Sequence, residues 1–170
     1  MRTICLALLL SVCLCGCGAQ ETFETVTDDM LMPVVAIQQE VSLALPEGAS
    51  LEVAEAEAGG KLYLCENYTV AVQTLDAGDL DKTLRTITGY GKDDLTLMQL
   101  RDGEYDRYEC AWAAAGEGQE QVGRTLILDD GSYHYTVTVM APASQAGELA
   151  ETWQSLIASV RLGAEVNTGS

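Results

Sequence analysis

Residues 122–140 read VGRTLILDDGSYHYTVTVM, two runs of apolar and β-branched residues joined by Asp130-Gly131. Aspartate followed by glycine tolerates the positive φ angles of a tight turn, so the stretch predicts strands at residues 122–128 and 132–140. Side chains alternate between the two faces of a strand. In the second strand one face carries Tyr133, Tyr135, Val137 and Val139, and the other carries His134, Thr136, Thr138 and Met140. The stretch therefore predicts a hairpin whose two faces differ.

Further strand patterns lie on the amino-terminal side of this hairpin. Asp102-Gly103 is a second turn signal, between predicted strands at residues 94–100 and 104–113. Earlier in the chain, Pro46-Glu47-Gly48 and Gly59-Gly60 separate short apolar runs. The strands predicted there are residues 32–37, 41–45, 51–57, 61–66 and 69–75, of which 51–57 is rich enough in alanine and glutamate to form a helix instead.

Two helices are predicted. The first covers residues 79–89, because Asp79 is a residue type that caps helix N-termini and Gly89 suits the left-handed C′ position. Its apolar stripe is Leu80, Leu84 and Ile87. The second covers residues 144–160 and starts at Ser144 as its cap. Its one-sided apolar face consists of Leu149, Trp153, Leu156, Ile157 and Val160.

This order of elements predicts the α+β class, because consecutive hairpins leave no parallel crossovers. We expect an antiparallel β-sheet of about six or more strands, packed with an inserted helix at about 79–89 and a C-terminal helix at about 144–160. The 170 residues carry 26 Asp and Glu against 9 Lys and Arg, a formal net charge of −17. Nucleic-acid binding is excluded as a function, because binding a negatively charged phosphate backbone requires a positively charged protein surface.

The first 17 residues have the pattern of an export signal. Arg2 precedes the uncharged residues 3–14, which are too few to span about 30 Å of hydrocarbon as a resident helix. Leu14-Cys15-Gly16-Cys17 then resembles the lipobox of bacterial lipoproteins, with Cys15 where that family usually has Ala or Ser. The resemblance implies cleavage before Cys17 and attachment of diacylglycerol, with fatty acids such as palmitate, to its sulfur. Ordinary secretion with cleavage near Ala19 and a buried N-terminal helix are the alternatives.

Lipidation at Cys17 implies a position on the extracytoplasmic face of the cell membrane, because two acyl chains hold a protein stably on a bilayer. We therefore expect a signal peptide at residues 1–16, a lipidated cysteine and acidic tether at 17–30, a single α+β domain at 31–162 and a flexible tail at 163–170. We expect the protein to be a monomer.

Over residues 41–162 the order of elements resembles the Mog1/PsbP-like fold, found in small extracytoplasmic lipoproteins of Gram-positive bacteria. The resemblance rests on the strand at residues 68–75 before the first helix and on LDDGSYHY at residues 128–135 before the last. It implies an accessory or regulatory binding protein. It brings no catalytic motif and no binding residue to this chain.

Of six cysteines, only Cys65 and Cys110 lie in the predicted domain. Export favours oxidation, so we predict a disulfide between them, which would stabilise the fold by about 4 kcal/mol in the chain-entropy model. Two reduced core cysteines are the alternative, and a redox or metal role is a third. Aromatic and arginine side chains are typical of binding surfaces, so those of the predicted strands define a candidate binding patch. The alternative is an ordinary sheet, in which these side chains have only a structural role and one face is buried. The candidate patch consists of Tyr105, Tyr108, Trp112, Arg124 and His134.

No metal ion, cofactor or catalytic residue is predicted. The chain has one histidine, no Asp-x-Asp-x-Asp-Gly loop and no nucleophile elbow, so its acidic clusters are predicted to be solvated turns and caps. These clusters are Asp28-Asp29, Asp93-Asp94, Asp129-Asp130 and Glu117 with Glu120. The favoured hypothesis is a membrane-anchored, non-catalytic binding or accessory module for a basic protein or a cell-wall polymer. The alternative is a carboxylate-dependent enzyme acting on a cell-envelope polymer, which would need two facing carboxylates in a cleft.

Overall fold

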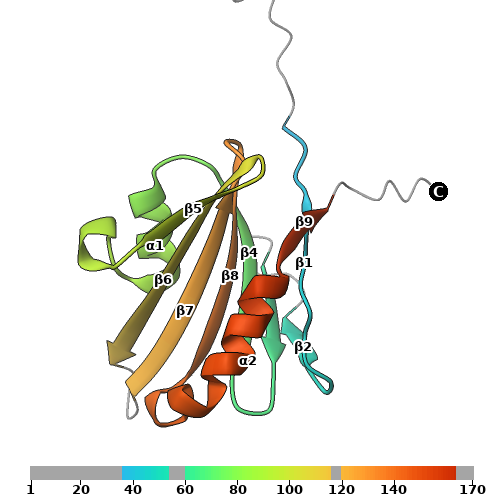
Figure 1. The fold of residues 1–170 in the computed structure, drawn as a ribbon, viewed down its shortest axis with the longest axis vertical. Coiled ribbons are helices and arrows are strands. Elements are labelled where there is room, and N and C mark those ends of the chain that lie inside the picture. Colours follow the sequence, from blue (N-terminus) through green and yellow to red (C-terminus); the bar gives the residue numbers. More distant parts are fainter. Residues whose placement is uncertain (1–35, 54–59, 116–119, 164–170) are drawn as a thin grey trace, which may run out of the picture. The chain divides into compact units, whose positions relative to one another are not determined.

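A computed structural model of the chain describes residues 36–53, 60–115 and 120–163. The chain divides into two units, Met1–Val35 and Ala36–Ser170, and every described residue belongs to the second. That unit contains a seven-stranded antiparallel sheet, a two-stranded sheet and two α-helices (Figure 1). The predicted α+β class is confirmed. The lipobox with Cys17, the acidic tether, residues 32–35 and the tail after Gly163 lie outside the described residues.

The main sheet has the strand order β2-β3-β4-β8-β7-β6-β5. Strands that follow one another in the chain are neighbours in the sheet, except for β4 and β5, which are separated because β8, β7 and β6 lie between them. Helix α1 and the β5–β6–β7 meander are therefore inserted between β4 and its partner β8. The strands are β2 (Ser50–Val53), β3 (Lys61–Leu64), β4 (Thr69–Asp76), β5 (Met98–Asp102), β6 (Tyr105–Ala115), β7 (Glu120–Asp129) and β8 (Tyr133–Pro142).

The β7–β8 turn forms where the sequence predicts it. Gly131 has φ 85°, a left-handed conformation that a side chain would strain. The Asp129 side chain accepts a hydrogen bond from the Gly131 amide at 2.8 Å, and the Asp130 side chain accepts one from the Ser132 amide at 2.8 Å. Both aspartates therefore stabilise the turn, in agreement with the prediction that this acidic pair belongs to a turn.

Helix α1 (Leu80–Thr88) confirms the predicted first helix. The Asp79 side chain accepts a hydrogen bond from the Asp81 amide at 3.0 Å, and Gly89 ends the helix with φ 82°. Leu84 is fully buried and packs with Cys110 and Ile127.

Helix α2 (Ala146–Ser159) matches the predicted second helix but begins later. A short 3₁₀ turn, η3 (Ala143–Gln145), precedes it, and the N-cap residue Gln145 makes no side-chain capping bond. The prediction that Ser144 caps the helix is wrong, because Ser144 lies inside the 3₁₀ turn and the first α-helical residue follows it by two. Trp153, Leu156 and Ile157 are buried as the apolar face predicted.

The two helices pack on opposite faces of the sheet (Figure 1). Because side chains alternate along β8, Tyr135 and Val137 belong to the core under α2, whereas His134 contacts α1. The core under α2 is the larger of the two and consists of Tyr68, Val70, Val72, Leu126, Leu128, Tyr135, Val137, Val139, Ala141, Trp153, Leu156, Ile157 and Val160.

A small second sheet pairs β1 (Glu40–Ser42) with β9 (Arg161–Gly163). The sequence predicted a strand at residues 41–45 and none at the end of the domain, because a three-residue strand with a distant partner has no local pattern. The strand predicted at residues 94–100 is also displaced, since Lys92–Asp94 forms a 3₁₀ turn, η2, and β5 begins at Met98. In the part of the chain that the structure describes, no helix is long and apolar enough to cross a membrane.

Candidate functional site

Helix α2 leaves part of its own sheet face uncovered. It packs mainly over β4, β7 and β8, whereas β5 and β6 continue the same face beyond it. In the β6–β7 register, Arg107 pairs with Leu128 and Glu109 with Leu126, so these two β6 residues share the face of the α2 core. On β5, Met98 and Leu100 are 46% and 49% exposed. The strip beside α2 is therefore an open part of this face.

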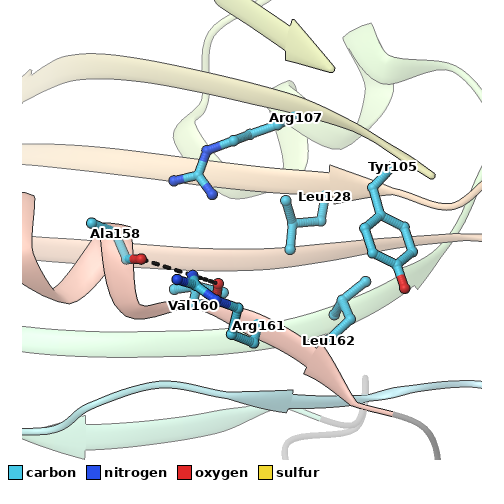
Figure 2. Close-up of a pocket in the computed structure, with 7 residues that line it drawn as sticks. All are labelled: Tyr105, Arg107, Leu128, Ala158, Val160, Arg161 and Leu162. Carbon is cyan, nitrogen blue, oxygen red and sulfur yellow. Dashed lines mark hydrogen bonds between the residues drawn. The ribbon is translucent and has the colours of Figure 1, made fainter. Parts of the chain in front are cut away.

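A cavity of about 410 Å³ opens beside the carboxyl end of α2 (Figure 2). Small-molecule sites typically have volumes of about 300–1,000 Å³. Although the chain has a net charge of −17, none of the described residues that line this cavity is a carboxylate. We call it the arginine cavity, and it is lined by Tyr105, Arg107, Leu128, Ala158, Val160, Arg161 and Leu162.

Figure 2 shows how these side chains are arranged. Both guanidinium groups extend toward the last turn of α2, while Leu128 and Leu162 lie between them and the ring of Tyr105. The cavity therefore has a positively charged end and an apolar middle.

Glu109 holds two arginines beside one another on this face. The residue is 8% exposed, and its two carboxylate oxygens accept hydrogen bonds from Arg107 Nε at 2.9 Å and from Arg124 Nη2 at 2.7 Å. Burial by itself raises the pKa of Glu109, but hydrogen bonds and positive charge from Arg124 and Arg107 outweigh burial and lower the pKa below its ordinary value. Glu109 is therefore ionised near neutral pH, and the group of three carries one net positive charge.

Both arginines of the cavity also contact the end of α2. Arg107 Nη2 donates to the Ile157 carbonyl at 3.2 Å, and Arg161 Nη1 donates to the Ala158 and Val160 carbonyls at 2.8 and 2.7 Å. The last carbonyls of a helix lack intrahelical partners, so these bonds cap α2 and fix the guanidinium groups. Among the described residues, Arg161 forms no ion pair with a carboxylate.

Tyrosine hydroxyls fix the start of the domain next to the cavity. Tyr105 Oη donates to Gln39 Oε1 at 3.1 Å, and the Gln39 amide donates to Tyr135 Oη at 3.0 Å. Tyr135 Oη in turn donates to Asp130 Oδ2 at 2.9 Å. Burial chiefly raises the pKa of Tyr135, to about 12, so its hydroxyl stays protonated. Gln39 and the Tyr105 wall of the cavity are thus held in one arrangement.

A second cavity, of about 520 Å³, lies near the amino end of α2. Its lining is mainly apolar, with Arg124 as the charged member: Ala111, Trp112, Ala113, Val122, Gly123, Arg124, Ala146, Ala150 and Trp153. It offers fewer polar groups for recognition than the arginine cavity.

The structure divides the residues of the predicted binding patch between the two sheet faces. Tyr105 and Arg124 lie on the α2 side, where Tyr105 lines the arginine cavity and Arg124 the second cavity. Tyr108 and Trp112 pack against the small core on the α1 side, and His134 is 1% exposed. Trp112 also lines the second cavity together with Arg124, but the five residues as a whole do not form one surface.

Trp112 has a structural role in this arrangement. Its indole lies over Gly123, where a Cβ atom would come within 2.4 Å of the ring, and its Nε1 donates to Thr125 Oγ1 at 3.0 Å. The absence of a side chain at Gly123 therefore makes room for the indole on the sheet.

His134 is enclosed between α1 and the sheet. Its Nδ1 lies 2.7 Å from Thr83 Oγ1, and its Nε2 lies 3.4 Å from Asp129 Oδ2. This order resembles an Asp–His–hydroxyl catalytic arrangement. Thr83 is only 5% exposed, however, and neither it nor His134 lines any of the cavities described here. The contact joins α1 to the sheet.

The predicted disulfide is wrong. Cys65 and Cys110 are free thiols. Cys65 follows β3 and packs against the core under α2, whereas Cys110 on β6 belongs to the core under α1. Four strand spacings of about 4.8 Å separate β3 from β6, which is far more than the Cα distance of about 7 Å that limits a disulfide. Burial raises the pKa of both thiols.

The described residues contain no group of three or more His, Cys, Asp or Glu that could hold a metal ion. Two further cavities, of about 430 and 140 Å³, have one lining carboxylate each, Glu151 and Glu40. The described residues thus supply none of the four cavities with the two carboxylates that the enzyme hypothesis needs. Of the other predicted acidic clusters, Asp93-Asp94 lies in η2 and Glu120 begins β7, whereas Asp28-Asp29 and Glu117 lie outside the described residues.

Arg107, Glu109 and Arg161 were not among the residues predicted from the sequence. A signal for the first two exists, because Tyr105, Arg107 and Glu109 share one phase of a strand, and ionisable residues that point toward a core are rare unless paired. For Arg161 no comparable local signal exists. Its position beside Arg107 depends on how α2 and β9 pack.

By its fold and its site, the protein is therefore an α+β domain with an arginine-lined cavity beside a helix. No family profile matches the sequence, and no curated protein matches it. A structure from Bacteroides thetaiotaomicron is similar with a TM-score of 0.50 and 14% identity over 74% of this chain. This chain spans 46% of that protein. The similarity supports the fold and says nothing about function.

Two other similar structures have lower TM-scores. LpqN of Mycobacterium tuberculosis, described as involved in cell envelope biogenesis, has a TM-score of 0.47 and 10% identity, covering 74% of this chain and 84% of its own. The Ran-binding protein Mog1p of Saccharomyces cerevisiae has a TM-score of 0.48 and 13% identity, covering 73% and 90%. Mog1/PsbP-like folds are thus among the similar structures, but this degree of likeness assigns no ligand.

Proposed function

We propose that this chain is a membrane-anchored extracytoplasmic lipoprotein that binds its ligand without a catalytic step, in the arginine cavity beside α2. The observation that carries the binding site is the cavity of about 410 Å³, which the described residues line with two fixed arginines and a tyrosine but with no carboxylate. The observation that supports the anchor is the sequence Leu14-Cys15-Gly16-Cys17 after an uncharged run. The acidic remainder of the chain suits a basic protein or a cell-wall polymer as a further partner.

Labelling with radioactive palmitate tests the anchor. Wild-type protein should incorporate the label, whereas Cys17→Ala should incorporate none and should remain uncleaved or be shed. Cys15→Ala is the matched control, because alanine is the usual residue at that place of a lipobox and labelling should persist. Label retained by Cys17→Ala, or lost equally in both variants, contradicts attachment at Cys17.

Site-specific photo-crosslinking in intact cells tests the binding site. A photoreactive amino acid at Tyr105 lies in the cavity wall, whereas the same amino acid at Lys82 lies on an exposed surface of α1. A bound molecule should be captured from position 105 and not from position 82. The same products from both positions, or none from position 105, contradict a ligand in this cavity.

A further inference from the structure

We infer that the arginine cavity binds an organic anion, a small molecule with an apolar body and one carboxylate or phosphate group held between Arg107 and Arg161. The inference rests on the proposed function, because it names the chemical class of the ligand for that same site.

The local charge of the cavity is opposite to that of the whole chain. The chain has only 9 Lys and Arg against 26 Asp and Glu, yet two of its arginines line this one cavity and a third lies next to them through Glu109. Among the described residues, these three arginines lie beside one carboxylate, that of Glu109. At physiological salt the Debye length is about 8 Å, so exposed acids elsewhere on the domain are screened while the guanidinium groups act directly on a bound group.

The guanidinium groups are held in place before any ligand arrives. Arg107 is fixed by Glu109 and by the Ile157 carbonyl, and Arg161 by two carbonyls at the end of α2. A planar guanidinium matches the two oxygens of a carboxylate or phosphate, and a fixed one loses little entropy on binding. Within the described part of the chain, Nε and Nη2 of Arg161 have no hydrogen-bond partner.

The other lining residues determine the polarity and the size of the part of the ligand that lies outside its anionic group. Leu128, Val160 and Leu162 supply apolar surface next to the charged end, and Figure 2 shows Leu128 and Leu162 between the guanidinium groups and Tyr105. A volume of about 410 Å³ corresponds to roughly 14 water molecules at about 30 Å³ each. A molecule with a single ring or a short branched chain fits this space, whereas a polymer would reach it only with one end.

Ligand-observed saturation-transfer NMR on the full chain in phosphatidylcholine nanodiscs tests the inference, with empty nanodiscs as the blank. The probes are benzoate for the carboxylate class, phenyl phosphate for the phosphate class and benzamide as the neutral analogue. We expect saturable binding of at least one anion and binding of benzamide at least tenfold weaker. Whichever anion binds more tightly identifies the class.

Substitutions of Arg161 and of a control arginine complete the test, and Arg161→Gln and Arg101→Gln each remove one positive charge. Arg161→Gln should weaken binding of the preferred anion at least tenfold, and Arg161→Lys should weaken it less because it keeps the charge and loses only the planar group. Arg101→Gln is the control, since Arg101 lies on β5 with its side chain 68% exposed and pairs with Asp106. Equal binding of benzamide, equal losses in Arg161→Gln and Arg101→Gln, or no saturable binding overturns the inference. If crosslinks from position 105 persist without anion binding, the chemical class is wrong and the binding site stands.

Discussion

Replacing Glu109 by glutamine tests whether the buried carboxylate organises the arginines of the site. Each hydrogen bond between charged groups contributes about 1.5–3 kcal/mol, and glutamine keeps one acceptor oxygen while its amide group faces the second guanidinium. One of the two bonds at 2.9 and 2.7 Å is therefore lost. The Arg124 side chain is 32% exposed and can turn toward water, so we expect Glu109→Gln to lower the free energy of unfolding by about 2 kcal/mol.

Urea unfolding followed by circular dichroism at pH 7 measures this change. Asp106→Asn is the control, because it breaks the exposed Arg101–Asp106 pair at 3.3 Å, which should cost less than about 1 kcal/mol. A loss below about 0.5 kcal/mol for Glu109→Gln would refute the view that Glu109 and its arginines form a coupled, buried group.

The pH dependence gives an independent check. The folded-state pKa of Glu109 is lowered, so its stabilising effect is complete above the unfolded pKa of about 4.3 and is lost as the pH falls through the folded value. The difference between wild type and Glu109→Gln should be constant from pH 8 to about pH 5 and should shrink below about pH 4. A difference that does not shrink as the pH falls below the unfolded value would show that packing, rather than charge, causes the loss.

Three further predictions concern the rest of the fold. Leu84→Ala removes a fully buried side chain from the small core and should cost about 3 kcal/mol in urea unfolding, whereas Leu100→Ala on exposed β5 should cost less than about 1 kcal/mol. Gly123→Ala should cost about 1–3 kcal/mol because its Cβ meets the Trp112 ring, while Gly147→Ala, with nothing within 4 Å, should be neutral or stabilising. Thiol titration of the unreduced protein should find Cys65 and Cys110 reactive after denaturation and slow to react when native, and a blocked pair would contradict the two-face placement.

Local patterns in the sequence were sufficient for the elements that have local causes. The Asp79 and Gly89 ends of α1 and the turn at Asp130-Gly131 formed where these residues predicted them. In each case a side chain or a positive φ angle acts within a few residues of the element it defines. The one failed start signal, Ser144, lies in a 3₁₀ turn that has the same local chemistry as a helix N-terminus.

Long-range placement explains what the sequence did not reveal. The Cys65–Cys110 pairing failed because an even number of exported cysteines says nothing about which faces they occupy. Strand phase correctly separates Tyr105 from Tyr108, but it does not place Arg161 beside Arg107. The placement of these two arginines in one cavity depends on how α2 packs on the sheet and on the pairing of β9 with β1.

Native mass spectrometry of the full chain, purified from its own membranes in a mild detergent, is the most direct test of whether the arginine cavity binds a small anion. We expect wild-type protein to retain a small anionic molecule, Arg161→Gln to lose it and Arg101→Gln to keep it. Wild-type protein that retains no such molecule, or equal retention in both variants, would contradict the arginine cavity as the binding site.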